Sequence, residues 1–319
     1  MLRQLLFGGS GLLFGFLPSD FRFSTESTQL LRSRFRKLED TKTKSMRISI
    51  AVVLFSMLLQ SCASHKFKDV AYLEDSENKQ NPKLNVFVPK QAKGKKLPVL
   101  IFIHGGNWNT GNKDTYGFYG RNFAKKDVVV VIPDYTLSPK AGYDVMAGQM
   151  AKVILWTKEN IAQYQGDPNQ IFITGHSAGG HLAALAVMNP KYGIKPGTVS
   201  GIVLNDAAGL DMKHYLEENP PEESNDYIST WTTNPEKWKD ASPIYFLNKN
   251  TPPFLIYTGS KTYESIKTAN ARFLKALQPL HPNVKPIVLN KKHIPMILQY
   301  FWPWNDRFDE TVKFMKAQQ

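Results

Sequence analysis

Apolar residues follow two different patterns along this chain, and both patterns predict strands. Residues 67–73 and 83–88 alternate apolar and polar positions, which is typical of antiparallel strands with one face toward solvent. Nearly continuous runs of Val, Leu, Ile and Phe indicate strands buried on both faces, as in a parallel sheet. Six further strands are predicted, at residues 97–103, 128–132, 170–174, 199–204, 254–258 and 284–289.

Helical segments are predicted between these strands. Their ranges are 115–125, 142–163, the Ala- and Leu-rich stretch after residue 177, 265–277, and 296–316 with an interruption at Pro303. Residues 211–247 are rich in Asn, Pro, Glu and Trp with little periodicity, so we expect a small cap insertion there. The alternation predicts a three-layer α/β/α sandwich around a mostly parallel, twisted sheet of about eight strands.

A glycine-flanked serine stands between a predicted strand and a predicted helix. The residues are Gly175-His176-Ser177-Ala178-Gly179, a GxSxG pattern in a strand–turn–helix context. Such a turn exposes a nucleophilic hydroxyl above the sheet edge and tolerates only small neighbours. Ser177 is therefore the candidate nucleophile; the alternative is an ordinary turn in which Ser177 caps the helix.

A serine hydroxyl needs a base, and the chain offers seven histidines. His293 follows the last predicted strand, where the chain order nucleophile, acid, base places it. We interpret His293 as the base, the alternative being a surface histidine on a loop. The remaining histidines are His65, His104, His176, His181, His214 and His281.

Three motifs together resemble a known group of enzymes. They are residues 104–108 (HGGNW), 134–139 (DYTLSP) and 175–182 (GHSAGGHL). Across residues 67–316 the chain resembles the esterase branch of the α/β-hydrolase fold that includes feruloyl and acetyl-xylan esterases, hormone-sensitive-lipase-like carboxylesterases and kynurenine formamidase. The resemblance implies this fold, acyl hydrolysis through an acyl-enzyme, and structural roles for His104 and His176.

The acid of the expected triad departs from the family pattern. Family members commonly carry GxxD after the strand that corresponds to residues 254–258, but Thr262 occupies the acid position here. A hydroxyl does not stabilise an imidazolium as a carboxylate does. Glu264 is therefore our first candidate and Asp206, directly after the strand at 199–204, the second. Asp211 is the third candidate.

The resemblance also indicates an oxyanion hole and a substrate pocket. Backbone N–H groups of Gly106 or Asn107, together with that of Ala178, would stabilise the developing oxyanion. Trp108 and cap aromatics could form an aromatic acyl or sugar pocket, or could be ordinary packing. The cap aromatics are Trp231, Trp238, Tyr227 and Tyr245.

We therefore expect a serine carboxylesterase that hydrolyses short-chain or carbohydrate-linked acyl esters. The alternatives are a kynurenine formamidase-like amidohydrolase and a catalytically weakened binding protein on a hydrolase scaffold. Metal-ligand spacing, phosphate-binding glycine loops and dinucleotide fingerprints are missing from the sequence, so we expect no metal and no cofactor. The formal net charge is +13, but basic residues are not interleaved with aromatics in a block, so we expect no nucleic-acid partner.

The only cysteine indicates where the protein is located. Cys62 follows a charged start at Met46 and a short apolar run, and residues 59–62 (LQSC) resemble the lipobox of bacterial lipoproteins. We therefore expect a signal peptide at 46–61, acylation of Cys62 and a tether at 62–66. The hydrolase domain would span 67–319, anchored in the cell envelope on the periplasmic or outer-membrane face. Residues 1–45 are interpreted as a mis-annotated upstream segment.

Overall fold

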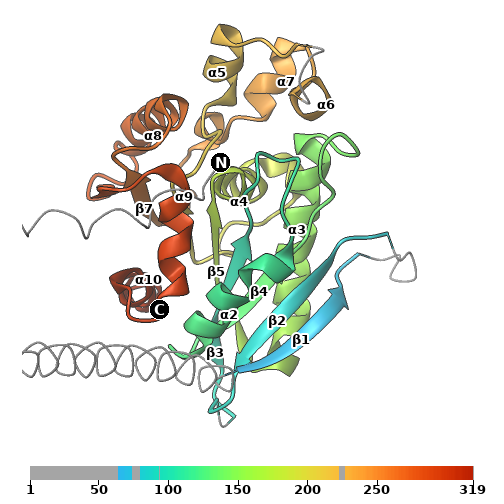
Figure 1. Cartoon of the computed structure of the whole chain (residues 1–319), viewed down its shortest axis with the longest axis vertical. Coiled ribbons are helices and arrows are strands. Elements are labelled where there is room, and N and C mark those ends of the chain that lie inside the picture. The colour runs from blue at the N-terminus through green and yellow to red at the C-terminus, as the bar shows by residue number, and fades with distance from the viewer. Residues whose placement is uncertain (1–63, 74–79, 93, 223–226, 319) are drawn as a thin grey trace, which may run out of the picture. The chain divides into compact units, whose positions relative to one another are not determined.

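The computed structural model describes residues 64–73, 80–92, 94–222 and 227–318 (Figure 1). The expectations for residues 1–45, the signal peptide and Cys62 lie outside the described residues. Within the described part, eight strands form one sheet in the order β1-β2-β4-β3-β5-β6-β7-β8.

The sheet is parallel except at one edge. β1 pairs antiparallel with β2, β2 pairs antiparallel with β4, and the remaining neighbours are parallel. The prediction of a mostly parallel sheet that opens with a hairpin is therefore confirmed. The strands are β1 (Ser64–Ala71), β2 (Lys83–Pro89), β3 (Leu97–Ile103), β4 (Val129–Pro133), β5 (Gly166–His176), β6 (Gly201–Asn205), β7 (Phe254–Gly259) and β8 (Ile287–Leu289).

The predicted tether is partly wrong, because β1 already begins at Ser64. Ser64 pairs with Pro89 and His65 pairs with Val88 in the antiparallel ladder. Backbone hydrogen bonds to β2 therefore extend the strand into residues that the sequence pattern assigned to a flexible linker, since their side chains lack the alternation that marks the rest of the strand.

Both faces of the sheet carry an apolar core. Along β3, Val99, Ile101 and Ile103 belong to one core cluster, whereas Leu100 and Phe102 belong to the other. This alternation follows from the two-residue period of a strand. The first cluster includes residues of α3 (Tyr143–Asn160), α4 (Ala178–Met188) and α8 (Glu264–Leu277), and the second includes residues of α2 (Gly117–Ala124) and α10 (Asp306–Lys316). The three-layer prediction is confirmed.

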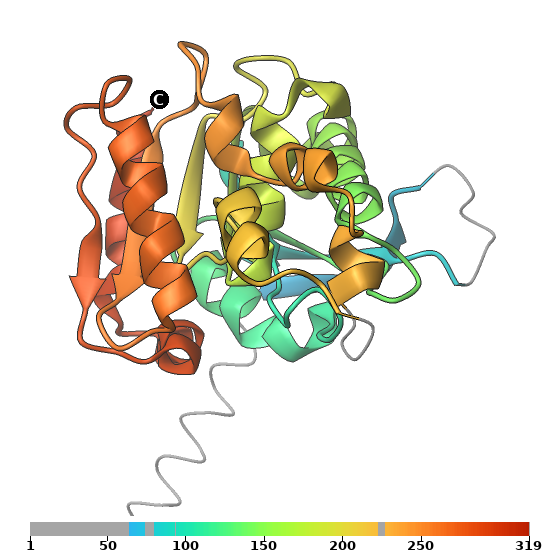
Figure 2. The ribbon, with the colours of Figure 1, turned by 90° about the horizontal axis from the view of Figure 1, so that it is seen from above.

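Residues 211–247 form a helical insertion rather than an irregular one. It contains α5 (Met212–Glu218), α6 (Tyr227–Trp231), α7 (Pro235–Asp240) and the 3₁₀ turn η5 (Pro243–Phe246). Seen from above in Figure 2, these yellow and orange helices lie across the ends of the strands, between the β1–β2 hairpin and the α8–β8 edge. The insertion is therefore placed as a cap over the carboxyl end of the sheet.

The last predicted helix is divided in two. Residues 296–316 were expected as one helix with an interruption, and the structure has α9 (His293–Leu298), the 3₁₀ turn η6 (Gln299–Phe301) and α10. Asn122 Nδ2 donates to Tyr300 O at 3.0 Å and Asn205 Nδ2 donates to Met296 O at 3.1 Å. These side-chain donors attach α9 and η6 to α2 and to the end of β6. Shorter 3₁₀ turns are η2 (Lys113–Tyr116), η3 (Ile161–Tyr164) and η4 (Pro190–Tyr192).

Candidate active site

Ser177 occupies a sharp turn between β5 and α4. Its backbone has φ 56° and ψ −123°, a strained conformation for a residue that carries a side chain. A Cβ added at Gly175 would lie 2.2 Å from the carbonyl carbon of Gly179, and one added at Gly179 would lie 2.1 Å from Ile103 O. Both glycines are therefore required by close backbone contacts. The turn has the geometry of the nucleophile elbow expected from the sequence.

His293 and Asp206 form the buried pair that supports the expected base. The His293 Nδ1 to Asp206 Oδ2 distance is 2.6 Å, and the two residues are 8% and 0% exposed. Asp206 directly follows β6, and His293 follows β8 as the first residue of α9. Adjacent parallel strands bring their carboxyl ends to one edge of the sheet, so residues far apart in sequence meet there.

This contact fixes the tautomer of the base. A carboxylate only accepts hydrogen bonds, so Nδ1 of His293 carries the proton that it donates to Asp206. In the neutral ring, Nε2 is then left as an acceptor. Ser177 and His293 line the same cavity, which places the candidate nucleophile and the candidate base at one site.

Glu264 is wrong as the first-choice acid. It is the first residue of α8, its side chain is 83% exposed, and Oε1 accepts a hydrogen bond from Lys267 Nζ at 2.7 Å. The direction of a side chain in the first turn depends on which face of the helix it occupies. Glu264 occupies the face of α8 that points to solvent. The carboxylate that contacts the His293 ring is instead that of Asp206, the second candidate.

Asp211, the third candidate, is also engaged elsewhere. Its Oδ1 accepts from His214 N at 3.2 Å, which caps α5, and its Oδ2 accepts from Arg272 Nε at 2.6 Å. A helix cap and an ion pair account for this buried carboxylate. Asp211 therefore supports the base of the cap and not the His293 ring.

His176 packs directly against the base. Its ring is stacked on that of His293 with centroids 4.5 Å apart, and its Nε2 donates to His293 O at 3.1 Å. Burial, and then the neighbouring His293, lower the pKa of His176 to about 3. His176 is therefore a neutral contact that orients the backbone of His293, in line with the structural role that the resemblance implied.

The predicted oxyanion loop borders the cavity. Gly106 and Asn107 line it with Ser177, while Ala178 is the first residue of α4, where backbone N–H groups lack partners within the helix. Asn107 has a positive φ of 49°, and its Oδ1 accepts from Tyr227 Oη at 3.3 Å. The loop is thus held from the cap by Tyr227, a contact that no sequence pattern indicated.

Trp108 lines the cavity as predicted, but Trp231 does not. Trp231 is 0% exposed and packs edge-on against Trp108 with centroids 4.7 Å apart. The pocket assignment of Trp231 is therefore wrong, because its ring lies behind Trp108 in the core. Trp238 is also buried, with Nε1 donating to Thr232 O at 3.0 Å.

A buried histidine connects the oxyanion loop to the cap. Trp108 Nε1 donates to His181 Nδ1 at 3.1 Å, so the other ring nitrogen carries the proton and donates to Ala241 O at 2.7 Å. Burial lowers the pKa of His181 to about 4. A neutral ring of one tautomer therefore joins the nucleophile helix, the loop and the cap.

The cavity beside Ser177 has a volume of about 630 Å³ and a largely apolar and aromatic lining. At its rim, Tyr263, Ile294, Leu298 and Phe301 are between 48% and 61% exposed. The Phe301 ring stacks on Phe118 with centroids 4.0 Å apart. The sequence pattern placed Leu298 and Phe301 only within a predicted helix and gave Tyr263 and Ile294 no role, because periodicity does not distinguish a rim residue from a core residue.

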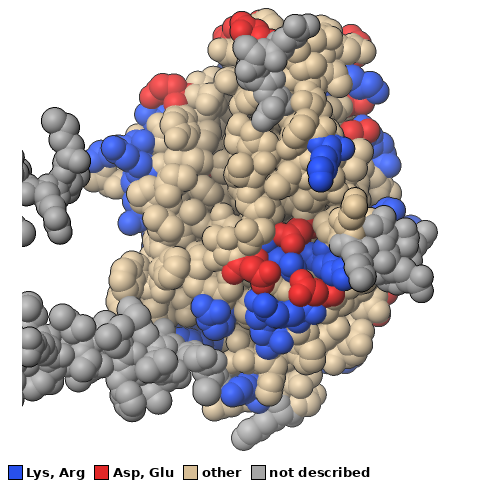
Figure 3. Space-filling model, turned by 45° about the vertical axis from the view of Figure 1, so that its right-hand side comes forward, with Lys and Arg blue, Asp and Glu red and all other residues tan. Residues whose placement is uncertain are grey.

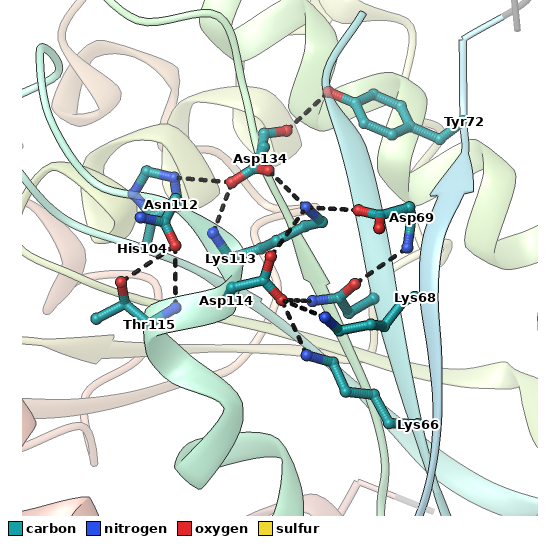
Figure 4. Close-up of polar contacts among 11 residues, drawn as sticks. Lys66, Lys68, Asp69, Tyr72, His104, Asn112, Lys113, Asp114, Thr115 and Asp134 are labelled. Atoms are coloured by element: carbon teal, nitrogen blue, oxygen red, sulfur yellow. Dashed lines mark hydrogen bonds and ion pairs between the residues drawn. The ribbon is translucent and has the colours of Figure 1, made fainter. Parts of the chain in front are cut away.

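A cluster of charged side chains around Lys113 lies where the loop that carries Gly106 and Asn107 ends. Lys113 Nζ lies 2.9 Å from Asp69 Oδ1 and 3.0 Å from Asp134 Oδ2, and Lys113 N donates to Asp134 Oδ1 at 2.6 Å (Figure 4). On one face of the molecule, basic and acidic side chains gather in a patch beside a broad area without charged residues (Figure 3). The cluster connects the β1–β2 edge to the loop that follows β3.

No group of three or more His, Cys, Asp or Glu side chains that could hold a metal ion occurs in residues 64–73, 80–92, 94–222 and 227–318.

Within the same described part, none of the helices is long and apolar enough to cross a membrane.

The sheet order, the elbow and the Asp206–His293 pair together define an α/β-hydrolase fold. A family model described as BD-FAE matches residues 84–276, which is more than half of the 319 residues. The chain therefore belongs to the BD-FAE family.

Curated relatives are esterases. Esterase LipQ of Mycobacterium tuberculosis is 34% identical over 185 residues, which cover 54% of this chain and 44% of LipQ. Isoprenylcysteine alpha-carbonyl methylesterase ICME of Arabidopsis thaliana is 26% identical over 299 residues, covering 84% of this chain and 67% of ICME. The chain spans about half the length of several curated relatives that it matches.

Solved structures share the fold at low sequence identity. Esterase B from Lactobacillus rhamnosis superposes with a TM-score of 0.65 at 18% identity, covering 86% of this chain and 96% of the other. A truncated carbohydrate esterase from gut microbiota gives a TM-score of 0.65 at 22% identity, covering 80% of this chain and 96% of the other. These likenesses support the fold assignment.

Proposed function

We propose that this protein is a serine carboxylesterase. Ser177 Oγ attacks the carbonyl carbon of an ester while its proton passes to Nε2 of His293, and the oxyanion accepts backbone hydrogen bonds. The alcohol leaves with that proton, and an acyl-enzyme remains on Ser177. Water then attacks the acyl carbon and gives a proton to Nε2 of His293. His293 passes this proton to Ser177 Oγ as the carboxylic acid leaves, which restores the free serine.

The observation that carries this proposal is the 2.6 Å contact between His293 Nδ1 and Asp206 Oδ2. Asp206 is fully buried, so its charge acts on the imidazole through a medium of low dielectric constant. The buried carboxylate holds Nδ1–H and stabilises the imidazolium that forms when Nε2 takes the serine proton. This arrangement, beside the Ser177 elbow, supports acyl transfer over a binding role alone.

The cavity supports an ester with at least one apolar group. Trp108, Phe118 and Phe301 provide aromatic surface, and Tyr263 lies 5.2 Å from His293 between ring centroids. We propose short-chain or carbohydrate-linked acyl esters as substrates. The similarity to an esterase and to a carbohydrate esterase supports this substrate class.

The test is the Ser177→Ala substitution in the full chain. We expect loss of p-nitrophenyl butyrate hydrolysis by at least about 10⁴-fold, because the nucleophile is removed while the oxyanion hole remains. A fluorophosphonate probe should label the parent protein and not the variant, and circular dichroism should show the same fold. Hydrolysis retained by a folded variant would refute the serine mechanism.

We also propose that the protein is lipid-anchored in a bacterial cell envelope. Support comes from the LQSC sequence at 59–62 and the apolar run that precedes it. Cells that express the parent chain should incorporate labelled palmitate into the protein and retain it in the membrane fraction, whereas Cys62→Ser should do neither. Equal labelling of the two proteins would exclude acylation of Cys62.

A further inference from the structure

The carboxylate of Asp206 is held by more than the base. Oδ1 accepts from Gly259 N at 2.8 Å, and Oδ2 accepts from both His293 Nδ1 at 2.6 Å and Thr262 Oγ1 at 2.5 Å. Asp206 is 0% exposed. Hydrogen bonds to a buried ionised group are short and strong, so these donors determine the orientation of the carboxylate.

Thr262 is placed to restrict rotation of this carboxylate. It is 8% exposed, and Thr262 N donates to Gly259 O at 3.2 Å in the turn between β7 and α8. The turn therefore fixes the Thr262 backbone relative to Gly259, the residue that holds the other carboxylate oxygen. Rotation of the Asp206 carboxylate would break both contacts together.

The hydroxyl and the imidazole converge on one oxygen. Thr262 Oγ1 lies 3.4 Å from His293 Nδ1, but both atoms donate their hydrogens to Asp206 Oδ2. The hydroxyl therefore does not compete for the ring proton. Tyr263, the next residue, lines the cavity, whereas the Thr262 hydroxyl is directed at the acid.

We propose that Thr262 is a positioning residue for proton transfer in this esterase. Its hydroxyl keeps Asp206 turned toward His293, so that the ring presents Nε2 to Ser177. This inference rests on the proposed serine mechanism. Because Thr262 acts through Asp206, its loss should slow the chemical step and leave substrate binding unchanged.

The geometry also predicts what a carboxylate at position 262 would contact. An Asp side chain extends one bond beyond the threonine oxygen, and that oxygen is already 3.4 Å from His293 Nδ1. A carboxylate at position 262 would therefore reach the ring. With Asn at position 206, the amide would still accept from Gly259 N and could donate to the new carboxylate.

The first test compares Thr262→Val with Thr262→Ser in the full chain. We expect Val to lower kcat for p-nitrophenyl butyrate roughly 10- to 100-fold with KM within about 2-fold, since small changes of catalytic orientation have effects of this size. Serine restores the hydroxyl and should recover kcat to within about 3-fold of the parent. Thr157→Val is the matched control, because Thr157 is a buried threonine whose Oγ1 donates to Val153 O at 2.7 Å, away from the site.

A spectroscopic measurement separates positioning from general stability. The His293 Nδ1 proton, held between nitrogen and carboxylate, should give a far-downfield proton resonance that Asp206→Asn removes. In Thr262→Val it should shift or broaden, and in Thr157→Val it should be unchanged. A folded Thr262→Val protein with the parent kcat and the parent resonance would overturn the proposal.

The second test moves the carboxylate. Asp206→Asn with Thr262→Asp should recover kcat at least about 10-fold over Asp206→Asn alone. If the folded double variant recovered no kcat, a side chain at position 262 would not act on the His293 ring. That result would overturn the geometric basis of the proposal. Failure of the serine mechanism itself is distinguishable, because Ser177→Ala would then retain activity.

Discussion

Two histidine–aspartate pairs lie at the carboxyl edge of the same sheet, and they differ in function. His293 and Asp206 follow β8 and β6, with 2.6 Å between Nδ1 and Oδ2. His104 and Asp134 follow β3 and β4, with 3.8 Å between Nε2 and Oδ1. The residue types are the same, so the difference must come from the other partners of each carboxylate.

The charge of Asp134 is neutralised by a lysine. Burial opposes the charge on Lys113, yet hydrogen bonds to Asp69 and Asp134 raise its pKa above the usual range. The His104 ring donates Nδ1–H to Gly105 O at 2.8 Å, which leaves Nε2 unprotonated beside Asp134 (Figure 4). Burial lowers the pKa of His104, so this ring stays neutral and structural.

Apart from the His293 imidazole, the donors that hold Asp206 carry no formal charge. They are the backbone N–H of Gly259 and the hydroxyl of Thr262. The carboxylate charge therefore remains available to stabilise the His293 imidazolium in the proposed acyl transfer. The comparison teaches that a nearby cation makes an acid structural, whereas donors without a formal charge preserve the effect of the acid on a neighbouring imidazole.

Removing each carboxylate in turn gives the largest expected contrast. Asp206→Asn should lower kcat by about 10³- to 10⁴-fold, because the tautomer of His293 is no longer fixed. Asp134→Asn should instead lower the unfolding free energy by about 1–3 kcal/mol, since the buried Lys113 loses an ion-pair partner. Urea unfolding and steady-state kinetics on both variants measure the two effects.

The double variant Lys113→Met with Asp134→Asn is the control for this contrast. It removes the buried cation together with its partner, so it should be more stable than Asp134→Asn alone. If Asp134→Asn reduced kcat as strongly as Asp206→Asn while keeping its stability, the two pairs would not differ as described.

Acidic pH should have a smaller effect, a loss of folding stability through the buried neutral histidine His181. The pKa of His181 is about 4, lower than the value of about 6.5 of an unfolded chain, so the unfolded state binds more protons below pH 6.5. Stability is then lost as pH falls from about 6.5 toward 4, and His181 should account for about 1 kcal/mol by pH 5.5.

His181→Gln measures this contribution. Glutamine can accept from Trp108 Nε1 and donate to Ala241 O without titrating. Urea unfolding at pH 7.5 and pH 5.5 should show a smaller loss of stability in the variant than in the parent. Equal losses in both proteins would mean that the ring titrates alike in folded and unfolded chains.

The smallest expected effect belongs to Glu264. Glu264→Gln removes an exposed pair with Lys267, so the unfolding free energy should change by less than about 0.5 kcal/mol. The kcat should stay within about 2-fold of the parent, because this carboxylate does not contact His293. A large loss of kcat in a folded variant would return Glu264 to the list of candidate acids.

Sequence patterns predicted what depends on local structure. Continuous apolar runs placed β3 and β4 within a residue or two, and the glycines around Ser177 identified the elbow because their spacing reflects local backbone contacts. His293 was found because chain order restricts where the base follows the last strand.

The acid could not be selected in the same way. Asp206 and His293 are 87 residues apart in sequence, and their contact depends on the register of β6, β7 and β8. Thr262 was interpreted as a missing acid, because a sequence does not show that its hydroxyl faces another carboxylate. Trp231 was assigned to the pocket because an aromatic residue has the same appearance in a sequence whether it lines a cavity or packs behind one.

The His181 ring sets a condition for redesigning the selectivity of the proposed esterase. Since it accepts from Trp108 and donates to Ala241, any transplanted segment at 212–246 must offer a carbonyl oxygen at the same point. Without that acceptor, the ring is free to adopt its other tautomer, and the indole N–H of Trp108 then loses its partner. Exchanging the cap segment to change selectivity would therefore also alter the loop that carries Trp108, unless the new segment keeps an acceptor for His181 Nε2.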